Sequence, residues 1–423
     1  MTGMQTYAAA EIGSMENVLY RIYGREYLGM TKRLLAASPL LTLLSEKEKE
    51  KSTRECAGEQ SGKAMPDRRL RILIKPNLVT PQPADFGGTT HPEIVSGIIE
   101  YLKENGYEDI TVAEGSWAGD STEEAAEYCG FYALCEKYGV PFIDTKKMPA
   151  VEVDTGRSVS AAANGGGDAA GLRLHVCAFL KDYDFLINVP VLKGHCQTRM
   201  TCALKNMKGL IPDSEKRRFH TLGLHRPIAH LNTVIRQDFI VIDHICGDPS
   251  FEEGGDPLVR NCIMTATDPV LCDSYACRIL GLSAEDVPYV GLAETLSVGT
   301  SSLEKLKVIT VEDPCGDAER DVPEGLSRVL EVSYAVEDAD SCSDCYAALT
   351  GALVRLREEG LLQKFTDAGG KICIGQGWRG ISGAGGKLRV GIGDCCAGFA
   401  CHVPGCPADE DEIYRALSDL ISP

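Results

Sequence analysis

The chain has 423 residues, of which 43 are Lys or Arg and 61 are Asp or Glu, so its formal net charge is −18. With 44% hydrophobic and 25% charged residues, the composition is typical of a globular protein of two or three domains and excludes a wholly disordered chain. The strong negative charge argues against a general binder of nucleic acid or of anionic membranes, because both would repel it.

No apolar run in the sequence reaches the roughly 18–20 residues that a membrane span needs, and the first residues lack the basic and apolar regions of a signal peptide. We therefore expect a cytoplasmic protein with no membrane partner. The cytosol keeps thiols reduced, so the 18 cysteines are not expected to form disulfides. Scattered cysteines are expected to be small buried apolar residues, whereas clustered ones need another explanation.

Residues 1–65 are predicted to form a helical extension followed by a linker. Met15 to Leu44 is compatible with helix, and the polar stretch from Ser45 to Asp67 is typical of a solvated linker. We expect this extension to be a packing arm or a contact in a homodimer.

From Arg69 the pattern changes to short apolar strands that alternate with helices. Alternation of this kind predicts βαβ units and a mostly parallel sheet. The predicted fold is therefore α/β: an open, mostly parallel sheet flanked by helices over residues 66–310, followed by a smaller C-terminal α+β, cysteine-rich domain over residues 311–423. The predicted strands cover 71–79, 109–115, 140–144, 184–190, 239–243 and 261–267, and the main predicted helices cover 92–105, 121–138, 267–280 and 346–359.

A cluster of cysteines marks the C-terminal domain. Cys342 and Cys345 form a CxxC at the start of a predicted helix, where two thiolates can bind one metal centre and free N–H groups stabilise their charge. Cys395 and Cys406 lie in glycine-containing turns, which let backbone N–H groups approach sulfur. These four residues are predicted to hold an iron–sulfur cluster of the 4Fe-4S type, with Cys396 or Cys401 as alternatives to Cys395.

Zinc is the alternative metal, and a site without metal is a third possibility. A zinc ribbon usually shows a second close CxxC, which this spacing lacks. The nearby segment Gly375 to Gly380 matches G-x-G-x-x-G, but the residues after it are a poor helix opening. We therefore predict a loop beside the cysteine site instead of a dinucleotide-binding turn.

A basic segment runs from Lys193 to Arg226. It holds eight basic and two acidic residues, a net charge of +6 within an acidic protein. Positive charge beyond the end of a parallel strand favours a small anionic ligand, either a carboxylate or a phosphate. The residues expected to act on that ligand are Lys193, His195, Lys205, Asn206 and Lys208, whereas Lys216, Arg217 and Arg218 are expected to be a solvated loop.

Three segments together resemble the family called "domain of unknown function 362". They are KPNLV…TTHPE, NVPVLKGHCQTRMTCALKNMKGL and IDHICGD…TATDPVLCDSYACRILG, within residues 69–300. Members of that family are often described as iron–sulfur proteins, and the C-terminal cysteine segment is similar to the tails of such members. By resemblance, the motif positions are Lys75, Asn77, Thr90, His91, Lys193, His195, Lys205, Asn206, Lys208, Asp243, Asp268 and Asp273.

Several motif positions also have purely structural interpretations. Thr90 and Asp268 each precede a predicted helix that starts with Pro, so each is also a candidate N-cap. Asp273, one turn into a helix, is expected to pair with a lysine. Lys75, Asn77, His91 and Asp243 are expected to bind the substrate.

These features together predict an oxygen-sensitive iron–sulfur redox enzyme that acts on a small anionic substrate. In this hypothesis His195, Lys205 and Lys193 are catalytic, and an electron-transfer protein is a partner. A non-enzymatic electron carrier is the first alternative, and it predicts no ligand-sized pocket at the basic segment. The second is an isomerase or racemase of a hydroxy acid, which a similarity in layout to the nickel-pincer lactate racemase fold suggests.

Overall fold

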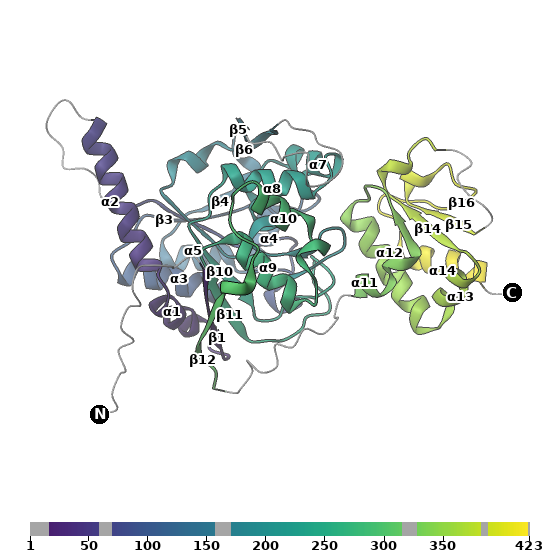
Figure 1. Cartoon of the computed structure of the whole chain (residues 1–423), viewed down its shortest axis with the longest axis horizontal. Coiled ribbons are helices and arrows are strands. Elements are labelled where there is room, and N and C mark those ends of the chain that lie inside the picture. The colour runs from purple at the N-terminus through teal and green to yellow at the C-terminus, as the bar shows by residue number, and fades with distance from the viewer. Residues whose placement is uncertain (1–16, 59–69, 157–170, 315–327, 382–387, 422–423) are drawn as a thin grey trace.

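The computed structural model describes residues 17–58, 70–156, 171–314, 328–381 and 388–421, which form a large N-terminal lobe and a smaller C-terminal lobe (Figure 1). Over these residues, no helix combines the length and the apolar character that a bilayer span requires. The sequence SAAANGGGDAAG over residues 160–171 also predicts a loop, and all of it except Gly171 lies outside the described residues.

The large lobe is built on one eight-stranded sheet in the order β12-β1-β11-β10-β7-β2-β3-β4. Neighbouring strands are parallel except for β11, which runs antiparallel to both β1 and β10. This confirms the predicted open, mostly parallel sheet. The strands are β1 (Val18–Tyr23), β2 (Ile72–Lys75), β3 (Ile110–Glu114), β4 (Phe142–Asp144), β7 (Phe185–Asn188), β10 (Phe239–His244), β11 (Cys262–Ala266) and β12 (Lys307–Glu312).

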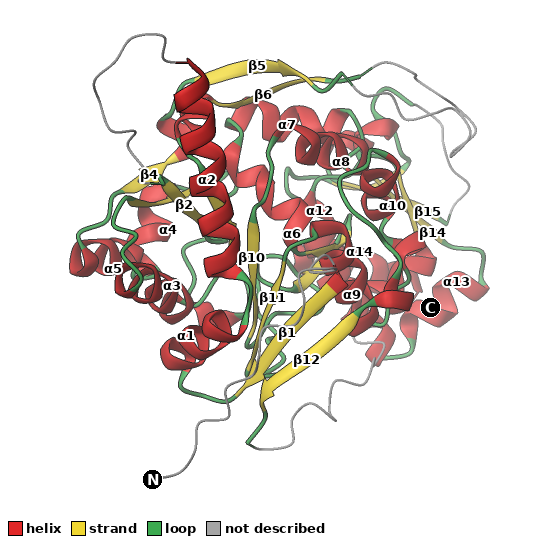
Figure 2. Cartoon of the chain, turned by 60° about the vertical axis from the view of Figure 1, so that its left-hand side comes forward, coloured by secondary structure: helices red, strands yellow, loops and turns green. Residues whose placement is uncertain are grey.

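Helices cover both faces of this sheet, so its central strands are buried on both sides. In β2, Ile72 and Ile74 belong to one hydrophobic core and Leu73 to the other. A run of apolar residues without polar alternation is the pattern that such two-sided burial requires. Figure 2 shows α1, α3 and α5 on one side of the sheet and α8 and α9 on the other. The helices of this lobe are α1 (Tyr27–Ala37), α2 (Leu40–Gly58), α3 (Pro92–Glu104), α4 (Thr122–Tyr128), α5 (Phe131–Tyr138), α6 (Ala203–Asn206), α7 (Asp213–Thr221), α8 (His225–Val234), α9 (Pro269–Ile279) and α10 (Pro288–Thr295).

The helix predicted from Met15 to Leu44 is wrong at its start, because Val18–Tyr23 is a strand. This strand, β1, pairs with β11 and β12 inside the main sheet (Figure 1). Its sequence VLYRIY is rich in β-branched and aromatic residues, which favour strands. Its partners lie more than 230 residues away along the chain, so local periodicity gave no sign of the pairing.

The polar stretch predicted as a linker is helical as far as Gly58, in α2. Its alternating Glu and Lys residues are good helix formers. Lys47 and Lys51 form ion pairs with Asp238 and Asp184, at 3.6 and 3.0 Å. These pairs hold the helix against the residues that precede β10 and β7. The single helix predicted over residues 121–138 is also two helices, because Gly130 adopts a positive φ of 78° between α4 and α5.

The C-terminal lobe contains a four-stranded sheet in the order β13-β14-β15-β16, parallel throughout. Its strands are β13 (Val336–Asp338), β14 (Lys371–Ile374), β15 (Arg389–Ile392) and β16 (Cys401–Val403). Its helices are α11 (Arg328–Val332), α12 (Ser343–Glu358), α13 (Leu361–Asp367) and α14 (Glu410–Ile421). After β14, the described residues as far as 381 form a 3₁₀ turn over Gln376–Trp378, in agreement with the predicted loop.

Candidate functional site

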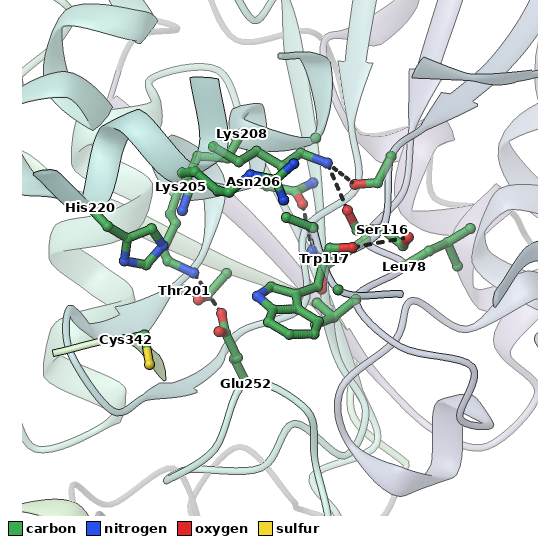
Figure 3. Close-up of a pocket in the computed structure, with 18 of the residues that line it drawn as sticks. Leu78, Ser116, Trp117, Thr201, Lys205, Asn206, Lys208, His220, Glu252 and Cys342 are labelled. Atoms are coloured by element: carbon green, nitrogen blue, oxygen red, sulfur yellow. Dashed lines mark hydrogen bonds and ion pairs between the residues drawn. The ribbon is translucent and has the colours of Figure 1, made fainter. Parts of the chain in front are cut away.

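A pocket of about 420 Å³ lies where strands of the large sheet end, and residues from both lobes line it. Figure 3 shows Lys205, Lys208, His220 and Trp117 around it, with Cys342 at its edge. Parallel strands bring their carboxyl ends to one edge of a sheet, which is where ligands of such folds bind. Four residues expected to act on a ligand line this pocket, namely Asn77, Lys205, Asn206 and Lys208.

Lys205 is held on the pocket wall by Glu252, whose Oε2 lies 2.8 Å from Nζ. The same Oε2 lies 2.7 Å from Nε2 of His195. His195 Nδ1 accepts the backbone N–H of Gln197 at 3.1 Å, so Nε2 carries the proton and donates to Glu252. Burial lowers the pKa of His195 to about 4, so the ring is neutral. His195 lies behind the wall and positions Lys205 through Glu252.

Lys208 lines the pocket without a hydrogen-bond partner among the described residues. Burial and the nearby ammonium of Lys205 lower its pKa to about 7. An ammonium with such a pKa can hold or release a proton near neutral pH. It is also the lysine that an incoming anion can pair with directly.

Helix α7 brings two further polar side chains to the pocket, and sequence reasoning missed both. Lys216, predicted to be in a solvated loop, is buried and donates to the carbonyls of Gly115 and Ser116 at 3.0 and 2.7 Å. His220 follows four residues later and so lies on the same helix face. Burial and Lys208 lower the pKa of His220 to about 3. The 3.6-residue periodicity of α7 was the signal that could have identified them.

The rest of the solvated-loop prediction holds in part. Arg217 lies on the helix with an exposed side chain, although it reaches the pocket mouth. Arg218 pairs with Glu215 at 2.5 Å, but Glu215 is buried, so this contact is not the predicted pairing with acidic surface.

Lys75 and Lys193 are fully buried beneath the pocket floor and do not line it. Lys193 donates to Asn77 Oδ1 at 2.7 Å, to the Glu252 carbonyl at 2.8 Å and to the Gly88 carbonyl, which uses all three donors. Lys75 forms an ion pair with Glu114 and a 3.2 Å hydrogen bond to Asn206 Oδ1. These contacts fix Asn77 and Asn206 on the pocket wall.

His91 and Asp243, expected to bind substrate, are absent from this pocket. They form their own buried pair, in which His91 Nδ1 lies 2.8 Å from Asp243 Oδ2. Although burial opposes the charged form, Asp243 raises the pKa of His91 to about 11. The resemblance identified His91 and Asp243 as motif residues. Membership of the motif could not show that their side chains point away from the pocket.

Three motif residues have structural roles. Asp268 caps α9 by accepting the backbone N–H groups of Val270 and Leu271, as predicted. Thr90 is not an N-cap, because His91 occupies that position and Thr90 Oγ1 donates to the Val189 carbonyl at 2.8 Å. The lysine partner predicted for Asp273 is also wrong: its carboxylate accepts the N–H groups that start α6, at 2.7 and 3.2 Å.

A second cavity, of about 130 Å³, lies in the C-terminal lobe. Cys342, Cys345, Cys395 and Cys406 all line it. Cys342 is the N-cap of α12 and Cys345 lies in its first turn. Cys395 follows β15 and Cys406 follows β16, so the parallel sheet brings both turns to one edge.

The two alternative ligands lie elsewhere. Cys396 is buried beside Phe399 and its thiol donates to the Cys373 carbonyl at 3.4 Å. Cys401, on β16, packs against the hydrophobic core of the lobe. Cys395 is therefore the member of this set that faces the cavity.

The four thiols around this cavity form a donor set that could hold a metal centre, either an iron–sulfur cluster or a zinc ion. A tetrahedral zinc ion with Zn–S bonds of about 2.3 Å would hold its sulfurs about 3.8 Å apart. A cluster separates its thiolates further, because each sulfur binds a different iron. The hydrogen bond between Cys342 and Cys345 keeps that pair close, so the donor set suits a thiolate-bound metal centre without selecting which metal.

Polar groups around the cysteine cavity suit bound thiolates. Arg379 Nε donates to Cys395 Sγ at 3.4 Å. A hydrogen bond from Cys345 lowers the pKa of Cys342 to about 6. Gly393, with φ of 81°, lies against Cys345, where a Cβ would come within 3.4 Å of the sulfur. Donors to sulfur and close backbone approach are features that tune cluster potentials.

The two cavities share part of their walls. Cys342 and Gln376 line both the 420 Å³ pocket and the 130 Å³ cysteine cavity. Trp117, from the loop after β3, also lines the pocket, with 37% of its surface exposed. A ligand in the pocket would therefore lie beside any centre that the cysteines hold.

Comparisons with known proteins give partial matches to a curated protein and to solved structures. The thylakoid-associated protein sll1697 of Synechocystis is 26% identical over 241 residues, which are 55% of this chain and 70% of that protein. A structural-genomics protein from Thermotoga maritima aligns at 15% identity with a TM-score of 0.31, over 52% of this chain and 54% of that chain. The lactate racemase apoprotein from Thermoanaerobacterium thermosaccharolyticum aligns at 12% identity with a TM-score of 0.31, over 55% of each chain.

The chain thus spans just over half the length of the solved structures that it matches. The family comparison covers the part of the pocket that lies in the large lobe, from the start of β2 into α9. Residues 72–278 match the model described as "Domain of unknown function (DUF362)", so the large lobe carries a DUF362 domain.

Proposed function

We propose that the protein is an iron–sulfur oxidoreductase that acts on a small anionic substrate, a carboxylate or a phosphate. The observation that carries the proposal is the wall shared between the cysteine cavity and the basic pocket, at Cys342 and Gln376. When bound, a cluster would supply or accept single electrons. A substrate in the pocket would lie next to it.

The composition of the pocket supports an anionic ligand. Lys205 and Lys208 present ammonium groups at its wall, and Arg217 lies at its mouth. Lys205 already donates a hydrogen bond to Glu252, whereas Lys208 has no such partner among the described residues. Lys208 is therefore the ammonium group most available to a ligand carboxylate. The electron-carrier alternative predicted no ligand-sized pocket at the basic segment, and the 420 Å³ pocket favours an enzyme instead.

The residues of the chain divide into three roles in this proposal. Lys205 and Lys208 bind the anion, and Lys208 holds or releases a proton at Nζ near neutral pH. His195 positions Lys205 through Glu252. Trp117, which also lines the pocket, covers part of the ligand and limits its contact with water.

The exposed position of Cys406 suggests where electrons would arrive. Electron transfer between proteins needs a centre that lies near the surface. The predicted electron-transfer partner would therefore approach the side of the C-terminal lobe that presents Cys406 and Arg379.

Anaerobic purification tests the centre. We expect brown protein with bound iron and broad visible absorbance, and we expect Cys342→Ala or Cys406→Ala to abolish both. Cys401→Ala is the matched control, because Cys401 lies on the same sheet but away from the cavity, and it should keep the colour. Colourless wild-type protein that holds zinc in place of iron would contradict the proposal.

A thermal-shift screen of small acids tests the pocket, since a ligand raises the melting temperature by mass action. A carboxylic or phosphoric acid should stabilise the wild type, and Lys208→Ala should remove that stabilisation. Lys181→Ala, at an exposed lysine of the same lobe, should respond as the wild type does. Equal stabilisation of all three proteins would place the ligand outside this pocket.

A further inference from the structure

The buried pair of His91 and Asp243, which the pocket does not use, borders a third arrangement of polar side chains. Asp85, His91 and Cys246 each present one ligand atom, and the three atoms lie within 4.8 Å of one another. They come from a 3₁₀ turn, from the N-cap of α3 and from the loop after β10. None of the three lines the basic pocket or the cysteine cavity.

The distances between these atoms match those around a tetrahedral zinc ion. His91 Nε2 lies 3.4 Å from Asp85 Oδ1 and 3.7 Å from Cys246 Sγ. With zinc bonds of about 2.0–2.1 Å to nitrogen and oxygen and about 2.3 Å to sulfur, tetrahedral geometry gives separations of about 3.4 and 3.6 Å. The side chains therefore need little movement to share one ion.

Asp243 orients His91 as a metal ligand. It accepts the ring N–H of Nδ1 and the backbone N–H of the same residue, both at 2.8 Å. Its second oxygen accepts the N–H of Ile245 at 3.0 Å, which fixes the carboxylate. A carboxylate that binds one histidine nitrogen turns the other toward a metal and makes it a better donor. The arrangement stabilises positive charge at Nε2, whether a proton or a metal ion supplies it.

We infer that Asp85, His91 and Cys246 form a zinc site in the large lobe, separate from the cysteine cavity. His91 and Cys246 are buried, whereas the Asp85 side chain is 92% exposed, so the site opens to solvent on that side. Three protein ligands with an open fourth position are typical of zinc ions that bind water or a substrate. This inference does not depend on the proposed function.

The other close set of ligand atoms in the described residues does not support the same inference. Cys202, Cys272 and Asp273 are all fully enclosed. Both carboxylate oxygens of Asp273 already accept backbone N–H groups, from Ala203 and Leu204. This set also lacks a histidine, so its polar atoms have the partners of an ordinary core.

Zinc content and zinc X-ray absorption of the full chain, after dialysis against Zn²⁺ and then zinc-free buffer, test the site. We expect about one zinc per chain, with one sulfur at about 2.3 Å and nitrogen or oxygen neighbours at about 2.0–2.1 Å. Cys246→Ser should remove the sulfur contribution. Asp85→Asn should lower zinc affinity at least tenfold. Because the Asp85 side chain is exposed, the fold should survive Asp85→Asn. This variant therefore still tests the site if Cys246→Ser unfolds the chain.

Glu93→Gln is the matched control, because Glu93 is also exposed and lies in the first turn of α3. It should retain wild-type affinity. Equal zinc affinity in Asp85→Asn, Glu93→Gln and the wild type would overturn the inference, as would absence of bound zinc. A spectrum with four sulfur neighbours that Cys406→Ala abolishes would place the ion in the cysteine cavity and would also overturn it. Iron content reports on the cluster independently, so failure of one proposal is distinguishable from failure of the other.

Discussion

Single residues at the pocket wall carry the clearest pH prediction. Lys208 has a pKa lowered to about 7, and the groups that face it are Lys205, Lys216, Glu252 and His220. Its positive charge is present below that pH and is lost above it, so affinity for an anion should fall as the pH rises through 7. Binding of a carboxylic acid that stays ionised from pH 6 to 9, measured by calorimetry, should weaken several-fold over that range. Lys208→Met should bind weakly at every pH, and a persistent pH dependence in that variant would assign it to another group.

Glu252 illustrates how a residue can serve the pocket and stability together. Its carboxylate bonds Lys205 and His195, and the two hold the pKa of Glu252 well below its usual range although burial opposes this. Glu252→Ala would leave Lys205 with an uncompensated buried charge, so we expect a loss of about 3–5 kcal/mol in the free energy of unfolding. Urea unfolding followed by circular dichroism measures it. Glu304→Ala, at an exposed position, should stay within about 0.5 kcal/mol of the wild type.

The sequence predicted those residues of the candidate site that lie in the short segment after the strand at 184–190. Lys205, Asn206 and Lys208 met that condition. Trp117 and His220 did not, because the first follows a different strand and the second lies on a helix that the sequence presented as a charged loop. Lys193 and His195 lie in the same segment, but they are buried and do not line the pocket. The sequence does not show whether a side chain points into a pocket or into the protein interior.

Secondary structure elements were predicted well where they depend on local pattern. The strands from β2 to β11 in the large sheet and helices α3 and α9 were expected from apolar runs, caps and glycine stops. β1 was not, since its pairing with β11 and β12 is set by distant residues. Gly130 divided a predicted helix because a positive φ cannot be read from helical periodicity alone.

Membership of β1 in the core gives a stability prediction at the scale of the element. Ile22 is fully buried among residues of the hydrophobic core that α1 and α3 share. Ile22→Ala should therefore destabilise the protein by about 2–5 kcal/mol through lost burial and a cavity. Leu420→Ala, 39% exposed near the end of α14, should change stability little. A neutral Ile22→Ala in urea unfolding would mean that β1 is peripheral to the sheet.

The whole molecule joins its two lobes next to the pocket. Gln197 in the large lobe donates to the Ser341 carbonyl, one residue before Cys342. Arg328 pairs with Asp256 at 2.6 Å, and its N–H donates to Ser250 Oγ at 2.9 Å. Cys196 also packs into the core of the C-terminal lobe. These contacts hold the cysteine cavity against the segment that carries Lys205 and Lys208.

On the proposed function, this junction predicts that a ligand bound in the pocket changes the spectrum of the cluster. A ligand in the pocket lies beside Cys342 and Gln376, which also line the cysteine cavity, so its charge changes the electrostatic field and the hydrogen bonds around sulfur. A stabilising acid should therefore shift the electron paramagnetic resonance spectrum of the reduced wild type. Lys208→Ala, which retains the cysteines, should show the cluster spectrum without that shift. A charge bound this close to a thiolate ligand must change the electrostatic potential at that sulfur. If a ligand raises the melting temperature of the wild type but leaves its spectrum unchanged, the ligand does not bind beside the cluster, and the pocket and the cluster act separately.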